Sequence, residues 1–218
     1  MSDDHETGAE SSVRGGPADW FWGLWEAGFC RWYGLMPVGE ASDGLFAVSR
    51  SRHHGAAVHL ADGVVVRSGD PLLEVHFRRE TLLAIGRLGS RRGVLQLRRL
   101  MDRDMPLLAE WIAPAGPDAE VVALHALSMF HRSAERWGWE ARPIESPLSR
   151  WWFSGYHRLL MARDHPEGRR RLGRRRAALV SQHLWISGDR LRQRYGQPPQ
   201  SPGVFRGRGP GGSKPPAE

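Results

Sequence analysis

The sequence of 218 residues contains one cysteine, Cys30, and one lysine, Lys214. A single cysteine excludes an internal disulfide and a zinc site made of several cysteines, which predicts a reducing compartment. No apolar run reaches the length that a membrane-spanning helix needs, and the first residues are acidic and polar, unlike a signal peptide. These absences predict a cytoplasmic protein without a transmembrane segment, and they leave a peripheral position at a membrane open.

Arginine supplies almost all of the positive charge, and the formal net charge is +7 with an isoelectric point near 10.8. Such a chain favours nucleic acid, anionic lipid or acidic glycans as partners, although interspersed acidic residues also fit a solvated mixed-charge surface. The densest cluster is the arginine run RRRLGRRR at residues 169–176. Because no helix-turn-helix, zinc finger, RNA-recognition motif or P-loop accompanies it, a basic nucleic-acid-binding protein is the least favoured alternative.

The two ends of the sequence differ from its middle. Residues 1–17 contain hardly any large apolar side chain, and residues 198–218 are rich in proline and glycine. Segments of this kind cannot bury enough apolar surface to offset the entropy lost on ordering, so we predict two disordered tails. The remaining residues, 18–197, suffice for a single domain with a hydrophobic core.

The first half of this domain combines a helix with short strands. The segment Ala18–Leu35 has apolar residues at intervals of three and four, which is typical of a helix. A β-hairpin section follows, with its turn at Asp62–Gly63. Along the next strand, Leu72–Phe77, side chains alternate between faces, so Glu74 and His76 share the face opposite to the apolar one.

The second half predicts helices and a β-α-β unit. Residues 81–112 are rich in Leu and Arg but are interrupted by Gly and Pro, which indicates two or three helical pieces. The segments 120–126 and 139–144 are typical of strands, and between them Ser128 can cap a short helix. Two strands joined in this way should be parallel. We therefore expect an α+β fold in which a mixed sheet is flanked by helices.

The stretch PIESP joins the last of these strands to another helix. Ser146 stands where a helix N-cap belongs, and Pro147 stands at the first helical position. The apolar stripe that follows includes Trp151 and Trp152, which we expect to face the core. Glu145 lies just beyond the end of a predicted parallel strand, where open α/β sheets bind ligands, or it only complements the helix dipole.

Candidate catalytic residues come from the strand and from this joint. Glu74 and His76 can aim an acid and an imidazole into one crevice, as general acid–base chemistry requires. Glu145 is the third catalytic candidate, and Arg78 and Arg79 are the candidates for holding an anion. The alternative for the Glu-His pair is a structural polar contact beneath the following helix.

The other histidines show no spacing typical of a metal site, such as HExxH, so neither a metal nor a cofactor is predicted. His125 lies within an apolar strand, where a histidine is usually a hydrogen-bonded core residue.

Several short motifs occur in a recognisable order. They are Asp62–Gly63, Gly69–Asp70, the strand ending at His76, Ala134–Glu140, Pro143–Ser146, His165–Pro166, and Trp185–Ser187 with Leu191. In this order they resemble the YkoP-like family, a bacterial family whose domain occurs alone and attached to polysaccharide deacetylases. In that family an asparagine follows the matching histidine within three residues, whereas Arg79 stands in that region here. The resemblance implies an α+β accessory domain linked to envelope polysaccharide metabolism, and it does not imply deacetylase activity.

Three functions remain open at this point. The first is an accessory module that binds a protein partner or an anionic small-molecule or lipid-linked ligand. The second is a small enzyme on a phosphorylated or glycosidic substrate, in which Glu74 and His76 exchange protons. The third, nucleic-acid binding, depends on the arginine run alone.

Overall fold

The computed structural model describes residues 44–112, 120–164 and 179–196, together with 34–39 and positions 28, 31, 168, 172 and 173. Apart from these positions, the expected N-terminal helix, the two expected tails and the arginine run lie outside the described residues.

A six-stranded mixed sheet forms the centre of the described chain, in the order β1-β2-β5-β6-β8-β7. The strands are β1 Met36–Pro37, β2 Phe46–Arg52, β5 Pro71–Phe77, β6 Ala123–Ser128, β7 Glu140–Pro143 and β8 Gln182–Ser187. Only β5 and β6 pair in parallel, and all the other neighbours in this sheet are antiparallel. Parallel neighbours need a long crossover, and two helices between β5 and β6 supply it. The predicted α+β class with a mixed sheet is confirmed.

Those two helices are α2, Arg79–Arg87, and α3, Gly89–Trp111. They confirm the prediction of two or three helical pieces. The break falls at Gly89, whose φ of +74° is a conformation that favours glycine. Helix α3 continues through Gly93 and Pro106, where the sequence also suggested interruptions.

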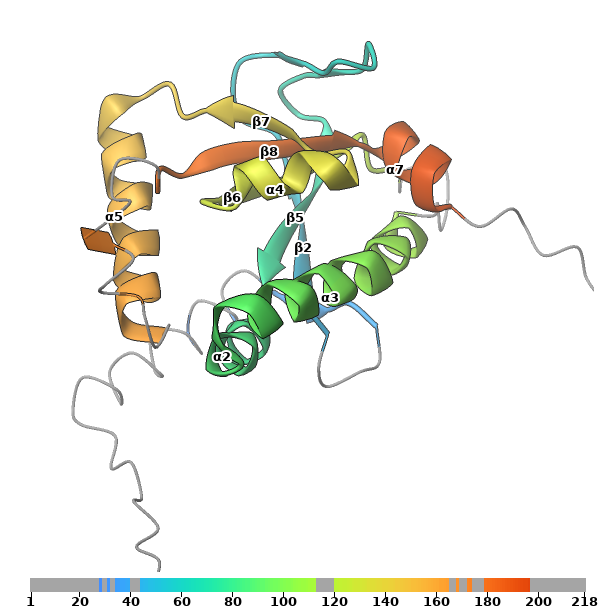
Figure 1. Cartoon of the computed structure of the whole chain (residues 1–218). Coiled ribbons are helices and arrows are strands. Elements are labelled where there is room, and N and C mark those ends of the chain that lie inside the picture. Colours follow the sequence, from blue (N-terminus) through green and yellow to red (C-terminus); the bar gives the residue numbers. More distant parts are fainter. Residues whose placement is uncertain are drawn as a thin grey trace, which may run out of the picture.

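Helices cover the apolar face of the sheet (Figure 1). Besides α2 and α3 they are α4, His131–Ala134, with the short 3₁₀ helix η2, Glu135–Trp137, and α7, Gly188–Tyr195. The main core joins their apolar residues to one face of the strands, including Leu73 and Val75 of β5. The predicted division of β5 into an apolar and a polar face is therefore confirmed.

A β-hairpin lies against the other face. Its strands are β3, Val58–His59, and β4, Val65–Val66, and its turn contains Gly63 at a φ of +89°. Leu60 and Val66 of this hairpin section pack against Leu72, Ala123 and Trp185 of the sheet. In Figure 1 the hairpin projects from the side of β7 and β8 that lies away from α3. The predicted hairpin is confirmed.

The β-α-β unit also has the predicted direction. Strands β6 and β7 both run antiparallel to β8, so they are parallel to each other, and β8 lies between them. Ser128 is the last residue of β6, and its Oγ accepts the Phe130 N–H where the chain turns toward α4. The N-cap residue of α4 is Phe130. Ser128 therefore lies two residues before the N-cap and bonds the backbone N–H of Phe130 instead of capping the helix itself.

Helix α5, Pro147–Asp164, follows β7. Ser146 Oγ accepts the Ser149 N–H at 3.2 Å, and Pro147 is the first helical residue, so the predicted joint is confirmed. The expectation that Trp151 and Trp152 face the core is wrong, because these residues are 70% and 63% exposed. The apolar face of the sheet is already covered by the other helices, and α5 stands at one end of the sheet (Figure 1).

Candidate functional site

Three polar side chains form a hydrogen-bonded chain on the face of the sheet opposite to the main core. Glu74 on β5 lies directly beside His125 on β6 in the parallel register. His125 Nδ1 is 2.8 Å from Glu74 Oε2, and His125 Nε2 is 2.8 Å from His183 Nδ1 on β8. The three residues are far apart in sequence, and sheet register alone brings them together. We call this group the histidine relay.

The carboxylate fixes one donor of the relay. Because an ionised carboxylate only accepts, His125 donates its Nδ1–H to Glu74. Nε2 of His125 and Nδ1 of His183 share the second hydrogen bond, in which either ring can donate. The relay therefore connects two imidazoles to one carboxylate, a set of groups that general acid–base chemistry uses.

The electrostatics keep the carboxylate charged and the outer histidine neutral. Burial opposes ionisation of Glu74, but the hydrogen bond and positive potential of His125 outweigh burial and hold the pKa of Glu74 below its usual value. Burial, assisted by neighbouring His125, lowers the pKa of His183 to about 4. At neutral pH His183 is therefore uncharged and able to accept a proton.

Aromatic rings enclose the inner part of the relay. Trp185, which is buried, lies over His125 with ring centroids 4.3 Å apart. His53 meets the edge of Trp185 at 5.6 Å. The side chains of His125 and Glu74 are 11% and 25% exposed, so water reaches the carboxylate only in part. The relay is thus a partly dry site on a rigid sheet.

The structure separates Glu145 from the other two predicted catalytic residues, Glu74 and His76. Glu74 and His76 do share one face of β5, as predicted, but Glu74 Oε2 bonds His125. Burial lowers the pKa of His76, which is half-buried. Glu145 is exposed in the joint after β7, and β6 and β8 lie between β7 and β5. Three strand spacings are about 14 Å, so Glu145 does not share a site with Glu74.

The two predicted anion-binding arginines begin the helix after β5. Arg78 occupies the N-cap position of α2, and Arg79 is its first residue. Both are half-buried. Neither lines the cavity beside the start of β8 or the cavity beside Leu107 and Trp111 of α3.

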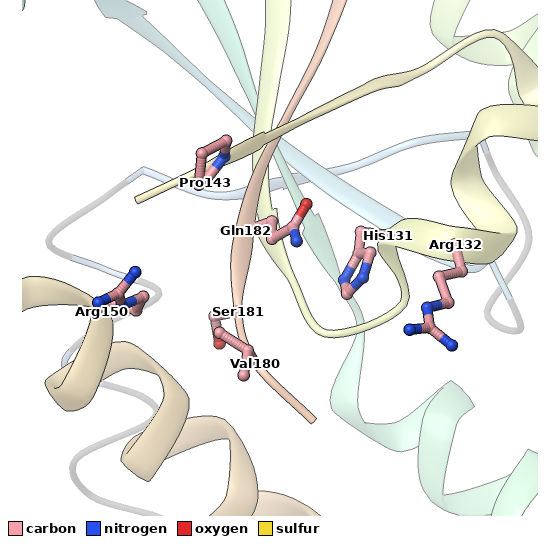
Figure 2. Close-up of a pocket in the computed structure, with 7 residues that line it drawn as sticks. All are labelled: His131, Arg132, Pro143, Arg150, Val180, Ser181 and Gln182. Atoms are coloured by element: carbon pink, nitrogen blue, oxygen red, sulfur yellow. The ribbon is translucent and has the colours of Figure 1, made fainter. Parts of the chain in front are cut away.

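A cavity of about 260 Å³ lies at the end of the sheet where β7 finishes and β8 begins. Figure 2 shows Arg150 of α5 on one side and His131 and Arg132 of α4 on the other, with Gln182 of β8 and the two residues before it between them. The lining residues are His131, Arg132, Pro143, Arg150, Val180, Ser181 and Gln182. Two guanidinium groups and no carboxylate line this cavity, which we call the arginine pocket.

Two polar side chains that line the arginine pocket, Ser181 and His131, differ in their hydrogen bonding. Ser181 is fully buried, and its Oγ lies 2.7 Å from Nδ1 of His157 on α5. Nδ1 of His131 is buried and forms no hydrogen bond among the described residues. Burial and the adjacent Arg132 both lower the pKa of His131. A ligand that enters the pocket can therefore meet positive charge and the imidazole ring of His131.

Sequence reasoning missed most of these residues. His183 and Trp185 are two residues apart in the predicted strand of residues 183–186, so a period-two pattern could have placed both side chains on one face. The expectation that His125 is hydrogen-bonded is confirmed. By contrast, Arg132 and Arg150 had no distinguishing pattern, because arginine is frequent throughout the chain.

Two further kinds of site, a metal-binding cluster and a membrane-spanning helix, are absent from the part of the chain that the structure describes. No three His, Cys, Asp or Glu side chains there are arranged to hold a metal ion. None of the helices there has the length and apolar character to cross a bilayer.

The fold and the site define a small α+β domain with a helix-covered apolar sheet face and an opposite face that carries the histidine relay. The family model of the YkoP domain matches residues 18–195, and the chain belongs to this family. No curated protein and no solved structure matches the chain.

Proposed function

We propose that this protein is a binding module for a small anionic ligand, with the arginine pocket as its site. The observation that carries the proposal is the approach of Arg132 and Arg150 from two different helices to one cavity without a carboxylate in its lining. Arginine pairs recognise phosphate and carboxylate groups through several directed hydrogen bonds. The implied link of the family to envelope polysaccharides points to phosphorylated sugars as the first ligands to test.

Further features of the pocket fit a ligand that carries a sugar as well as a negative charge. The imidazole ring of His131 lines the cavity and adds a polar group to it. The Gln182 side chain lies between the two basic sides (Figure 2) and can contact a polar ligand without adding charge. The cavity of about 260 Å³ is near the lower end of the range of small-molecule sites, which suits a phosphate with one sugar ring.

Calorimetric titration with inorganic phosphate, a hexose phosphate and a sugar nucleotide tests the proposal. We expect the hexose phosphate to bind and the double variant Arg132→Gln/Arg150→Gln to lose at least about tenfold in affinity, because charged hydrogen bonds are worth about 1.5–3 kcal/mol. Arg91→Gln/Arg92→Gln, which removes two exposed arginines from α3, is the matched control. Absence of binding by all three anions, or equal losses in both variants, contradicts the proposal.

The histidine relay supports a second candidate function, a small enzyme on a phosphorylated or glycosidic substrate. Its carboxylate orients His125, and His125 is hydrogen-bonded to His183. This chemistry differs from the predicted Glu74 and His76 pair, since the partner of the carboxylate is His125. Activity with chromogenic phosphate esters or glycosides, lost in Glu74→Gln and in His183→Gln, would support it. No turnover with either substrate class removes it.

A further inference from the structure

Helix α5 is attached to the rest of the domain by polar contacts. Ser154 Oγ accepts the N–H of Ser181, and His157 bonds the hydroxyl of the same residue. One turn further on, Arg158 Nε donates to the carbonyl of Leu179. None of the residues of α5 belongs to the two apolar clusters found in the described chain. The helix therefore keeps its polar side inward, contrary to the usual pattern of surface helices.

The outer side of α5 carries an apolar stripe. Leu148, Trp152, Gly155 and Leu159 follow one another at intervals of four, three and four residues, so they lie in one line along the helix. All four are exposed, and the three large side chains are 73%, 63% and 55% exposed. Trp151, which is 70% exposed, lies beside this line. We call these five residues, none of which is charged, the tryptophan face.

The spacing of the tryptophan face is that of one helix packed against another. Intervals of four and three are those of the a and d positions in a coiled coil. When two identical helices pack antiparallel around a two-fold axis, residue i of one copy contacts residue j of the other, and j contacts i. With the axis between positions 153 and 154, Leu148 lies opposite Leu159 of the second copy. In the same register Trp152 lies opposite Gly155, so the largest side chain meets the residue that has none.

Gly155 leaves room for the tryptophan of the second copy. A Cβ atom at this position would meet no atom within 4 Å, so the space next to it is open. The antiparallel register fills that space with the indole of Trp152, once in each direction. A parallel pair would set tryptophan against tryptophan and glycine against glycine, which gives a clash and a void. The side-chain sizes along the stripe are therefore complementary to themselves in one orientation only.

The apolar area of the tryptophan face fits a dimer. The exposed parts of its two tryptophans and two leucines amount to about 300–500 Å² in each copy. Homodimer interfaces are about 65% apolar, so the matching interface measures about 900–1,500 Å² over both copies. This overlaps the range of specific protein interfaces, about 1,200–2,000 Å². The face is thus large enough to hold two copies together.

We propose that the tryptophan face is the interface of a two-fold symmetric homodimer, in which α5 packs antiparallel against α5 of a second copy. The occupant is a second copy because the fit of Trp152 to Gly155 is a fit between two residues of the same stripe. The dimer also explains the orientation of α5. Polar contacts hold its inner side to the domain, and the second copy buries the apolar side that the domain leaves exposed.

Sedimentation equilibrium of the full chain tests the proposal. We expect a species of twice the 24.5 kDa of one chain, which dissociates on dilution. Trp152→Ala should weaken the dimer by at least about a hundredfold, because central tryptophans dominate interface energies and the two-fold axis uses this one twice. Stability is compared at concentrations where the wild type is monomeric, because dimerisation raises apparent stability. There the variant should keep the wild-type thermal midpoint, since Trp152 is largely exposed in one copy.

A swap of the two facing residues tests the register. Gly155→Trp fills the gap without touching its own chain, so it should also weaken the dimer by at least about a hundredfold. Trp152→Ala/Gly155→Trp again sets a tryptophan opposite a small residue, so it should recover dimerisation to within about tenfold of the wild type. The controls on α3 are Val94→Ser/Leu95→Ser, which removes an exposed apolar pair, and Arg92→Trp, which adds an exposed tryptophan. Both should dimerise as the wild type does.

Several results would overturn the proposal. A chain that stays monomeric at high concentration does so, and so does association that survives both Trp152→Ala and Gly155→Trp. Losses in both single variants without recovery in the swapped variant would contradict the antiparallel register. Binding of the monomer to lipid vesicles or to RNA, lost in Trp152→Ala, would assign the face to that partner. The Arg132→Gln/Gln182→Ala variant of the arginine pocket should remain a dimer, so this test does not depend on the proposed ligand.

Discussion

Helices α3 and α5 are the two long helices of the described chain, and they face the sheet in opposite ways. Helix α3 buries Met101, Met105 and Leu108 in the main core, which also contains Leu73 and Val75 of β5. Helix α5 turns Ser154 and His157 inward and exposes its tryptophans. Apolar burial is the main source of stability, so α3 holds the fold together. The apolar side of α5 contributes little to folding, which makes it available for binding.

The largest effect that would sharpen this comparison comes from one substitution made in each helix. Leu108→Ala should lower the free energy of unfolding by about 2–5 kcal/mol, because Leu108 is fully buried and the change leaves a cavity. Leu159→Ala, the matched change on α5, should cost less than about 0.5 kcal/mol at a residue that is 55% exposed. Urea unfolding of both variants measures the difference. Similar losses would show that α5 packs as α3 does.

A smaller effect concerns pH and the polar contacts of α5. Burial lowers the pKa of His157 to about 4, whereas an unfolded histidine titrates near 6.5. Between these values the unfolded chain binds more protons, so stability is complete above pH 6.5 and is lost as the pH falls toward 4. The loss attributable to His157 should be about 1–3 kcal/mol.

The measurement is urea unfolding at several pH values in the wild type and in His157→Gln. The variant should have a flatter profile, because glutamine does not titrate. His183, whose pKa is also about 4, gives a parallel contribution from the relay, so some slope should remain. An unchanged slope in His157→Gln would mean that His157 is accessible to protons in the native state.

The smallest effect comes from the joint that begins α5. Ser146→Ala removes the oxygen that accepts the Ser149 N–H, and it should cost about 1 kcal/mol of stability. Glu145→Ala, one residue earlier, should leave the thermal midpoint nearly unchanged, because this side chain is exposed. A midpoint that collapses in Glu145→Ala would instead place Glu145 in a structural network. A loss of ligand binding without loss of stability would return it to a functional role.

The parts of the fold that were predicted correctly depend on local patterns. Alternation along β5 placed Leu73 and Val75 in the core and Glu74 on the opposite face. Turn and cap chemistry placed the hairpin at Gly63 and the start of α5 at Ser146. Each of these features involves residues close in sequence, where backbone preference and side-chain periodicity act directly.

The parts that were missed depend on pairing between distant segments. Strand alternation predicted Glu74 as a candidate acid or base beside His76, but only the register of β5, β6 and β8 decided that its hydrogen-bond partner is His125. The same holds for the arginine pocket, because Arg132 and Arg150 meet only where α4 and α5 flank the end of β8. Many such pairings are compatible with one sequence pattern, and packing of the whole domain selects among them.

Helix α5 shows where the boundary lies. The apolar stripe that contains Trp152 could be read from its spacing, and so could the helix itself. The spacing could not show whether the stripe faces the core or the solvent, because a periodic pattern identifies an apolar side without identifying what covers it. That choice was made by the tertiary structure. Helices α3, α4 and α7 already cover the apolar face of the sheet, and the buried apolar clusters of the described chain include nothing from α5.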